Sequence, residues 1–152
     1  MKALVFAVLL SAVLLSGCSA LSPQPLGNDI QFSTITKGDG IQLSYTGEAN
    51  LVIKSPGEWI ANIGQRLPPT LNFSNEVVIA ALYGEKPHGG YNMDITSIRR
   101  VGGNTVVFVN RVAPGPTCFN NQSATWPYDI IKINRTYAVN IIFQNNDSVK
   151  NC

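Results

Sequence analysis

The chain contains one histidine, His88, and three cysteines, Cys18, Cys118 and Cys152, and these side chains bound the chemistry that it could perform. A general base, a Ser-His-Asp relay or a Cys-His dyad would each have to use His88. A zinc site needs three or four His, Cys or carboxylate ligands in register, and a copper site at His88 and Met93 would have only two ligands. No glycine-rich phosphate loop follows a predicted strand. We therefore expect no enzyme, no metal site and no cofactor.

Cys18 follows a segment that is typical of exported lipoproteins. Residues 3–15 are apolar except for one serine, which is too short for a membrane span of about 20 residues but suits a secretory signal. The run ends in Leu-Ser-Gly-Cys, which resembles a bacterial lipobox, whose cysteine is lipidated and becomes the mature N-terminus. We expect residues 1–17 to be a lipoprotein signal peptide and residues 18–29 to be a lipid-anchored linker. An ordinary signal peptide cut elsewhere is the alternative.

Lipidation of Cys18 would place the protein in the bacterial cell envelope, anchored to a membrane, which is the outer membrane if the host is Gram-negative. Export implies an oxidising compartment, where the two remaining thiols, Cys118 and Cys152, usually pair. We expect this disulfide, which would tie a C-terminal tail (residues 146–152) to the domain. Two free thiols, or a Cys118–His88 dyad, are the alternatives.

Composition and strand patterning predict a mainly β fold. Only 13% of the residues are charged, and the 13 glycines and 9 prolines disfavour long helices. The net charge of +2 comes without a basic run, so nucleic acid is not an expected partner. We expect one β-rich domain over residues 30–145, a small β-sandwich or barrel-like sheet. Short, turn-bounded strands are predicted at residues 30–36, 41–45, 50–54, 76–83, 91–101, 105–112, 126–134 and 137–144.

Local signals refine this prediction. Ser-Pro-Gly-Glu at residues 55–58 is a capping box that predicts one short α-helix near residues 56–66, ended by Pro68-Pro69. The apolar run at residues 76–83 predicts a strand buried on both faces. We expect a bulge where the alternation after Ile95 changes phase, a hairpin turn at Gly102-Gly103, and pairing of the last two strands.

The segment Pro87-His88-Gly89-Gly90-Tyr91 is the most distinctive loop. Proline fixes φ near −65°, and two glycines permit backbone shapes that other residues avoid. Tyr91 either anchors such a loop by packing beneath it or is presented by it to a partner, since tyrosine in rigid loops is common at binding surfaces.

Residues 71–134 resemble the C-terminal domain of the PrcB family of protease-complex subunits. Residues 84–91 match the family motif Gly-x-x-Pro-Thr-Gly-Gly-Tyr, with His88 in place of the threonine. Residues 114–118 match its Pro-Gly-x-x-Cys loop, and Trp126-Pro127-Tyr128 matches its late Pro-Tyr strand. Glu58-Trp59 suits the Glu-Trp pair often found before this domain.

The resemblance implies a non-catalytic, membrane-anchored lipoprotein that binds or stabilises a secreted or membrane-associated protease. The two loops, residues 85–91 and 113–119, would then form a partner-binding edge. Its expected residues are Pro87, His88, Gly89, Gly90, Tyr91, Pro114, Gly115 and Pro116. In a second interpretation, the same loops act as in chagasin-like cysteine protease inhibitors, to whose loop Pro-x-Gly-Gly-Tyr is similar. In a third, the protein binds another ligand in the envelope.

Overall fold

The computed structural model describes residues 28–40, 43–118 and 120–152. The predicted signal peptide, Cys18 and all but the last two residues of the predicted linker lie outside these ranges. Within them, no helix is both long enough and apolar enough to span a bilayer.

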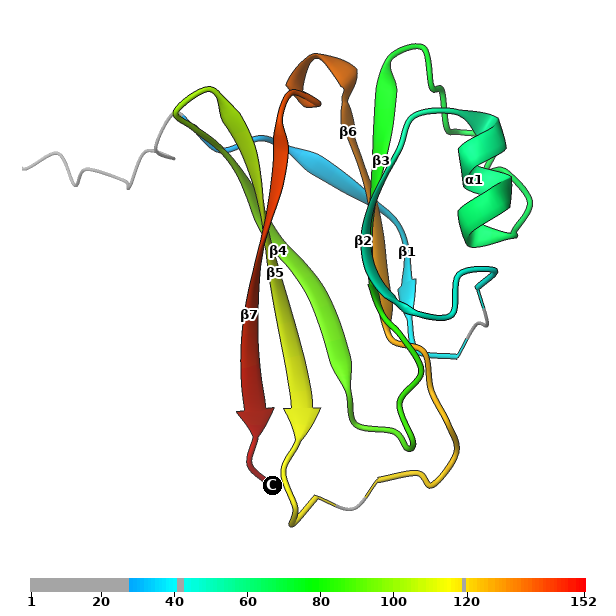
Figure 1. Cartoon of the computed structure of the whole chain (residues 1–152), viewed down its shortest axis with the longest axis vertical. Coiled ribbons are helices and arrows are strands. Elements are labelled where there is room, and N and C mark those ends of the chain that lie inside the picture. Colours follow the sequence, from blue (N-terminus) through cyan, green and yellow to red (C-terminus); the bar gives the residue numbers. More distant parts are fainter. Residues whose placement is uncertain (1–27, 41–42, 119) are drawn as a thin grey trace, which may run out of the picture.

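Seven strands in the described part of the chain form two sheets that face each other (Figure 1). The four-stranded sheet has the order β1-β6-β3-β2 and the three-stranded sheet the order β4-β5-β7. The described strands form no closed barrel, so the prediction of a small, mainly β sandwich with one short helix is confirmed. The strands are β1 (Phe32–Gly38), β2 (Glu48–Ile53), β3 (Glu76–Tyr83), β4 (Asn92–Val101), β5 (Asn104–Pro114), β6 (Tyr128–Asn134) and β7 (Ile141–Lys150).

Neighbouring strands are antiparallel except β5 and β7, which are parallel. β4 and β5 form the predicted hairpin, whose turn places Gly102 at φ +55° and Gly103 at φ +86°, where glycine has no steric penalty. The predicted bulge is also present, because the β4–β5 register shifts between Ile95 and Ser97.

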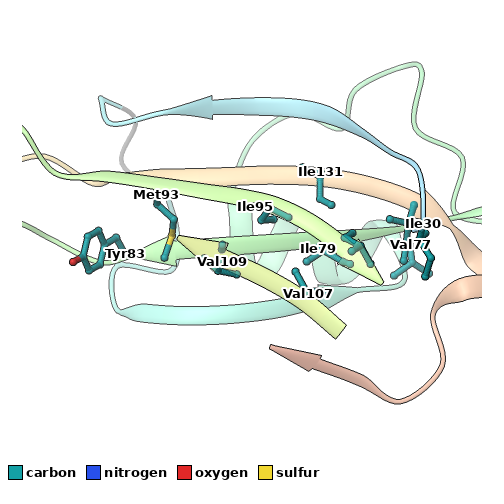
Figure 2. Close-up of a cluster of buried hydrophobic side chains, with 12 residues drawn as sticks. Ile30, Val77, Ile79, Tyr83, Met93, Ile95, Val107, Val109 and Ile131 are labelled. Carbon is teal, nitrogen blue, oxygen red and sulfur yellow. The ribbon is translucent and has the colours of Figure 1, made fainter. Parts of the chain in front are cut away.

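The strand β3 is the centre of the fold, because it is buried on both faces as predicted. Its residues alternate between two cores. One core fills the space between the sheets (Figure 2), and the other lies between the four-stranded sheet and α1 (Pro56–Ile63). The molecule therefore has three layers: helix, four-stranded sheet and three-stranded sheet.

The helix begins as the capping box predicts but ends earlier. The Glu58 amide donates to Ser55 Oγ (3.2 Å), whereas the Glu58 carboxylate accepts from the Lys54 amide (2.7 Å) and not from that of Ser55. Gly64, at φ +73°, ends the helix before Pro68-Pro69 is reached. A Cβ at Gly64 would overlap Ser44 Oγ, so the chain needs glycine there.

The prediction of a strand at residues 41–45 is wrong for its described part, residues 43–45. The amides of Ser44 and Tyr45 donate to the carbonyls of Ile63 (3.3 Å) and Asn62 (3.0 Å). This segment thus satisfies the free carbonyls at the end of the helix instead of joining a sheet.

The predicted pairing of the last two strands is also wrong. β6 pairs with β1 and β3, while β7 crosses to the other sheet and pairs with β5. A 3-10 turn, Arg135–Tyr137, occupies the start of the predicted last strand. The region predicted as a tail differs as well, because β7 extends to Lys150. Polar cross-strand pairs support this polar part of β7, including Asn146 Nδ2 to Asn110 Oδ1 (3.1 Å).

Candidate functional site

Two chain segments come together at one end of the sandwich, which is the lower end in Figure 1. The first is the β3–β4 loop, residues 84–91, and the second is the long β5–β6 connection, residues 114–118 and 120–127. We call these segments together the loop end. The C-terminus lies beside them.

Backbone hydrogen bonds tie the first segment to the later part of the second. Lys86 and Thr125 exchange two bonds, N to O, of 2.8 and 3.0 Å. The Gly89 amide donates to the Asn121 carbonyl (2.7 Å), and Thr125 Oγ1 donates to the His88 carbonyl (3.1 Å). The β3–β4 loop is therefore held by residues 120–125, and the two segments form one continuous surface.

Gly90 allows the β3–β4 loop to approach Asn120 and Pro114 of the second segment closely. It adopts φ +91°, and a Cβ there would overlap Asn120 Oδ1 and lie 2.9 Å from Asn120 Cγ and 3.1 Å from Pro114 Cβ. Such contacts are too short for a real side chain, so a glycine is required on both conformational and steric grounds.

Tyr91 lies partly beneath the loop, in a cluster of aromatic and cationic groups. Its ring packs edge-on against the Tyr83 ring, with centroids 5.8 Å apart, and lies 5.3 Å from the His88 ring. The Lys86 ammonium lies 3.9 Å from the centroid of Tyr83 and 5.9 Å from that of Tyr91. Tyr91 is half-buried against the inter-sheet core. This is the packing expected if Tyr91 anchors the loop.

The cluster continues into an ion-pair network between the edges of the two sheets. Arg111 on β5 contacts Asp147 through two nitrogens (Nε–Oδ1 2.6 Å, Nη2–Oδ2 2.7 Å) and also pairs with Glu48 on β2. The hydrogen bond to Asp147 raises the pKa of Arg111 and lowers that of Asp147. Burial raises the pKa of Tyr83. Arg111 and Tyr83 thus stay protonated near neutral pH and act as fixed groups.

Lys86 differs from Arg111 in its charge balance. Among the described residues, no carboxylate lies within salt-bridge distance of the Lys86 ammonium. Its positive charge is held instead over aromatic rings, an arrangement that is favourable but leaves the charge available to an incoming carboxylate.

The second segment is fixed to the end of β7. The predicted disulfide is present and joins Cys118 to Cys152, with Cα atoms 5.1 Å apart. The Gly115 amide donates to the Lys150 carbonyl (2.9 Å). Pro116 and Thr117, between these two attachments, are exposed. The loop end therefore presents exposed residues on a backbone that is fixed on both sides.

The groups with potential for chemistry are engaged in structural contacts. The Cys118 sulfur is bonded to Cys152, so it cannot form a thiolate dyad with His88. His88 Nδ1 lies 2.9 Å from the Gly89 carbonyl, which can only accept, so this nitrogen carries the proton. Within the described ranges, no group of three or more His, Cys, Asp or Glu side chains is arranged to hold a metal ion.

All eight residues that the sequence proposes for the partner-binding edge lie at the loop end, where Gly90 approaches Pro114 and Gly115 is fixed to Lys150, but these residues differ in exposure. Pro87, Gly90 and Pro116 are exposed, while Gly89 and Gly115 are buried. Sequence reasoning missed residues 120–125, which hold the first loop, because this polar segment has no periodicity. Lys86 lies within the predicted loop, residues 85–91, but was not singled out, and Arg111, near the end of a predicted strand, was not named at all.

Comparison with known proteins gives one match. The family model described as PrcB C-terminal matches residues 77–134. No curated protein and no solved structure matches the chain. The matched segment runs from β3 into the end of β6, so it contains the loop end but not β7, to which the second segment is fixed.

Proposed function

Because residues 77–134 match the family model described as PrcB C-terminal, we propose that the protein is a non-catalytic subunit that binds or stabilises an exported protease through the loop end. In this proposal a lipid on Cys18 anchors the protein to a membrane of the bacterial cell envelope. The protease as partner rests on the family, and the anchor rests on the lipobox-like sequence.

One observation carries the choice of the loop end as the docking surface: its two segments are joined by backbone hydrogen bonds into one fixed surface. A surface that is already ordered loses little conformational entropy on binding. Pro87, Pro116 and Thr117 are exposed on it. Lys86 adds a positive charge nearby that forms no salt bridge with a described residue, which favours a partner segment that carries a carboxylate.

The test is capture of the protease followed by measurement with the purified pair. The lipidated protein is used to capture proteins from its own envelope, and the recovered protease is identified by mass spectrometry. Its affinity is then measured for Thr117→Arg, which adds bulk at the loop end, and for Lys86→Met, which removes the charge but keeps the stem. Thr70→Arg, exposed in the connection after α1, is the matched control.

We expect Thr117→Arg and Lys86→Met each to weaken binding at least about tenfold, as expected for residues near the centre of an interface, and Thr70→Arg to leave it unchanged. Recovery of no protease, or equal affinity for all variants, would overturn the proposal.

The inhibitor interpretation keeps one structural observation in its favour, because both loops lie at one end of a sandwich (Figure 1). The two functions differ in their effect on the protease. A stabilising subunit preserves or raises proteolytic activity at equal molar amounts, whereas an inhibitor lowers it. Titration of the captured protease with the purified protein separates them.

A further inference from the structure

The end of the sandwich opposite the loop end carries a patch of exposed apolar side chains. It consists of Val101 (52% exposed), Tyr137 (44%), Val139 (42%) and Ile142 (47%), which we call the apolar patch. These residues come from the β4–β5 hairpin, the β6–β7 connection and the start of β7, which lie at the upper end in Figure 1.

Hydrogen bonds that Thr105 donates hold the β6–β7 connection against β5. The Thr105 amide donates to the Val139 carbonyl (3.2 Å), and Thr105 Oγ1 donates to the Tyr137 carbonyl (2.5 Å). Thr105 is itself fully buried in β5 next to the hairpin turn. The apolar patch is therefore a feature of the fixed sandwich.

Two arginines lie beside the patch. Arg99 is half-exposed and pairs with Asp29 (3.0 Å). Arg100 donates to Thr105 Oγ1 (3.1 Å), and it lines a cavity of about 310 Å³ together with Tyr137 and Asn28. Among the described residues, no carboxylate forms a salt bridge with Arg100.

The first described residues of the chain lie at the same end. The Arg100 amide donates to the Asn28 carbonyl (2.7 Å), and the Ile30 amide donates to the Ile98 carbonyl (2.8 Å). Cys18 precedes Asn28 by ten residues, and a chain of that length reaches at most about 35 Å. A lipid on Cys18 would therefore keep this end within about 35 Å of the bilayer.

We propose that the apolar patch is a membrane-contact surface, on which Tyr137 and the three aliphatic side chains enter the headgroup region while Arg100 faces anionic headgroups, Arg99 being paired with Asp29. The inference rests on the lipid anchor of the proposed function. Exposed apolar patches commonly mark interaction sites. Tyrosine is enriched at the membrane interface, and basic residues are attracted to anionic lipids. An apolar surface flanked by arginines and tethered to a bilayer is therefore suited to lipid.

This orientation has a consequence for the loop end. β4 begins next to the loop end, at Asn92, and ends at the apolar patch, at Val101. Ten strand residues span about 30 Å. With the apolar patch on the membrane, the loop end faces the aqueous space about 30 Å above it, where it can meet the soluble part of a protease.

The test measures the depth of single tryptophans in the lipidated protein. Val139→Trp places the probe in the apolar patch, and Val149→Trp, which replaces another exposed valine at the other end of β7, is the matched control. Both are reconstituted in vesicles of phosphatidylethanolamine and phosphatidylglycerol whose acyl chains carry bromine near the headgroup. The signal of the wild-type protein, with Trp59 and Trp126, is subtracted.

We expect the added fluorescence of Val139→Trp to fall at least about twofold, because interfacial side chains reach about 5–10 Å into the boundary, and that of Val149→Trp to be unchanged. Arg100→Gln, added to Val139→Trp, should reduce the quenching, as should vesicles of phosphatidylcholine alone. Equal quenching at both positions, or none at Val139→Trp, would overturn the inference. The inference would also be overturned if the captured protease, and not lipid, covered the tryptophan of Val139→Trp, because a protein would then occupy the patch.

The same proteins in detergent separate this inference from the proposed function. Val101→Ser with Ile142→Ser should still bind the protease with unchanged affinity. If Val139→Trp is not quenched by lipid but still binds the protease, only the membrane contact is refuted. If Val139→Trp is quenched but binds no protease, only the proposed partner is refuted.

Discussion

Asp129 is the buried carboxylate that links the two sheets. It lies on β6 and is only 4% exposed, and its Oδ2 accepts a hydrogen bond from the Ile95 amide (2.7 Å) beside the bulge of β4. Its Oδ1 is buried and has no hydrogen-bond partner among the described residues. Burial raises the pKa of Asp129, and the Ile95 amide and the nearby Lys37 offset part of this rise.

The raised pKa predicts the pH dependence of Asp129→Asn. The folded protein binds the Asp129 proton more tightly than the unfolded chain does, so Asp129 favours folding at low pH and loses this contribution as the pH rises from its ordinary pKa of 3.8 through the raised one. Asparagine keeps an oxygen for the Ile95 amide and has no charge. The free energy of unfolding of Asp129→Asn, measured in urea, should therefore increase relative to wild type between about pH 3 and 7.

Asp147→Asn is the control with the opposite sign. The hydrogen bond from Arg111 lowers the pKa of Asp147, so its contribution is present above the ordinary pKa of 3.8 and is lost as the pH falls through the lowered one. Asp147→Asn should thus be less stable than wild type at pH 7, with a gap that closes in acid. A pH-independent gap for Asp129→Asn would show that its carboxylate is not the source of the effect.

At the scale of single elements, the β3–β4 loop depends on Gly90. Gly90→Ala should lower the free energy of unfolding by about 1–3 kcal/mol, because it combines left-handed strain with overlap against Asn120. Gly103→Ala is the matched control, since Gly103 has a similar φ, +86°, but open space around it. The free energy of unfolding of each variant is measured in urea, and the difference between the two losses gives the part that is due to overlap with Asn120. Equal losses would mean that the loop does not need its close contact with residues 120–121.

The disulfide at the end of β7 supports the second segment of the loop end. Cys118 and Cys152 are 34 residues apart, and the chain-entropy model gives about 4 kcal/mol for a loop of that length. The double variant Cys118→Ser, Cys152→Ser should therefore unfold at a clearly lower urea concentration than the wild-type protein in which Cys118 and Cys152 form the disulfide. Reduced wild type should match the double variant. Identical stability of oxidised and reduced protein would show that β7 is held by its pairing with β5 alone.

The strand β7 also shows where sequence-based prediction reaches its limit. Residues 146–148 are Asn-Asp-Ser, which have no apolar alternation, so the sequence predicts them as the start of a tail. Their strand is stabilised by backbone pairing with β5 and by polar cross-strand contacts such as Arg111–Asp147. Parallel pairing leaves no short turn in the sequence, so neither the partner strand nor the crossover between sheets was predictable.

Signals that arise from adjacent residues were read correctly. The helix start at Ser55 and the hairpin turn at Gly102-Gly103 each follow from residue types at fixed positions. The disulfide between Cys118 and Cys152 was predictable in another way, because these are the two thiols left once Cys18 is assigned to lipid. The loop end was predictable in two of its parts: residues 85–91, because Pro87-His88-Gly89-Gly90 restricts its own backbone, and residues 113–119, through the family resemblance. Residues 120–125 hold the β3–β4 loop through backbone groups, which carry no signal in the residue types.

At the scale of the whole molecule, β3 should make folding a single cooperative event. Val77 faces the core between the sheets and Val78 faces the core beneath α1, and both are fully buried. Val77→Ala and Val78→Ala should each cost about 1–3 kcal/mol, and each should lower the stability of both layers because the strand is shared. In a Trp126→Phe background, the fluorescence of Trp59 reports the helix side, since Trp59 is 1% exposed there, and far-ultraviolet circular dichroism reports the strands. The two signals should change at one urea concentration in wild type and in both variants. If Val78→Ala shifted the Trp59 transition alone, α1 would be a separate unit that docks on a sandwich already stable without it.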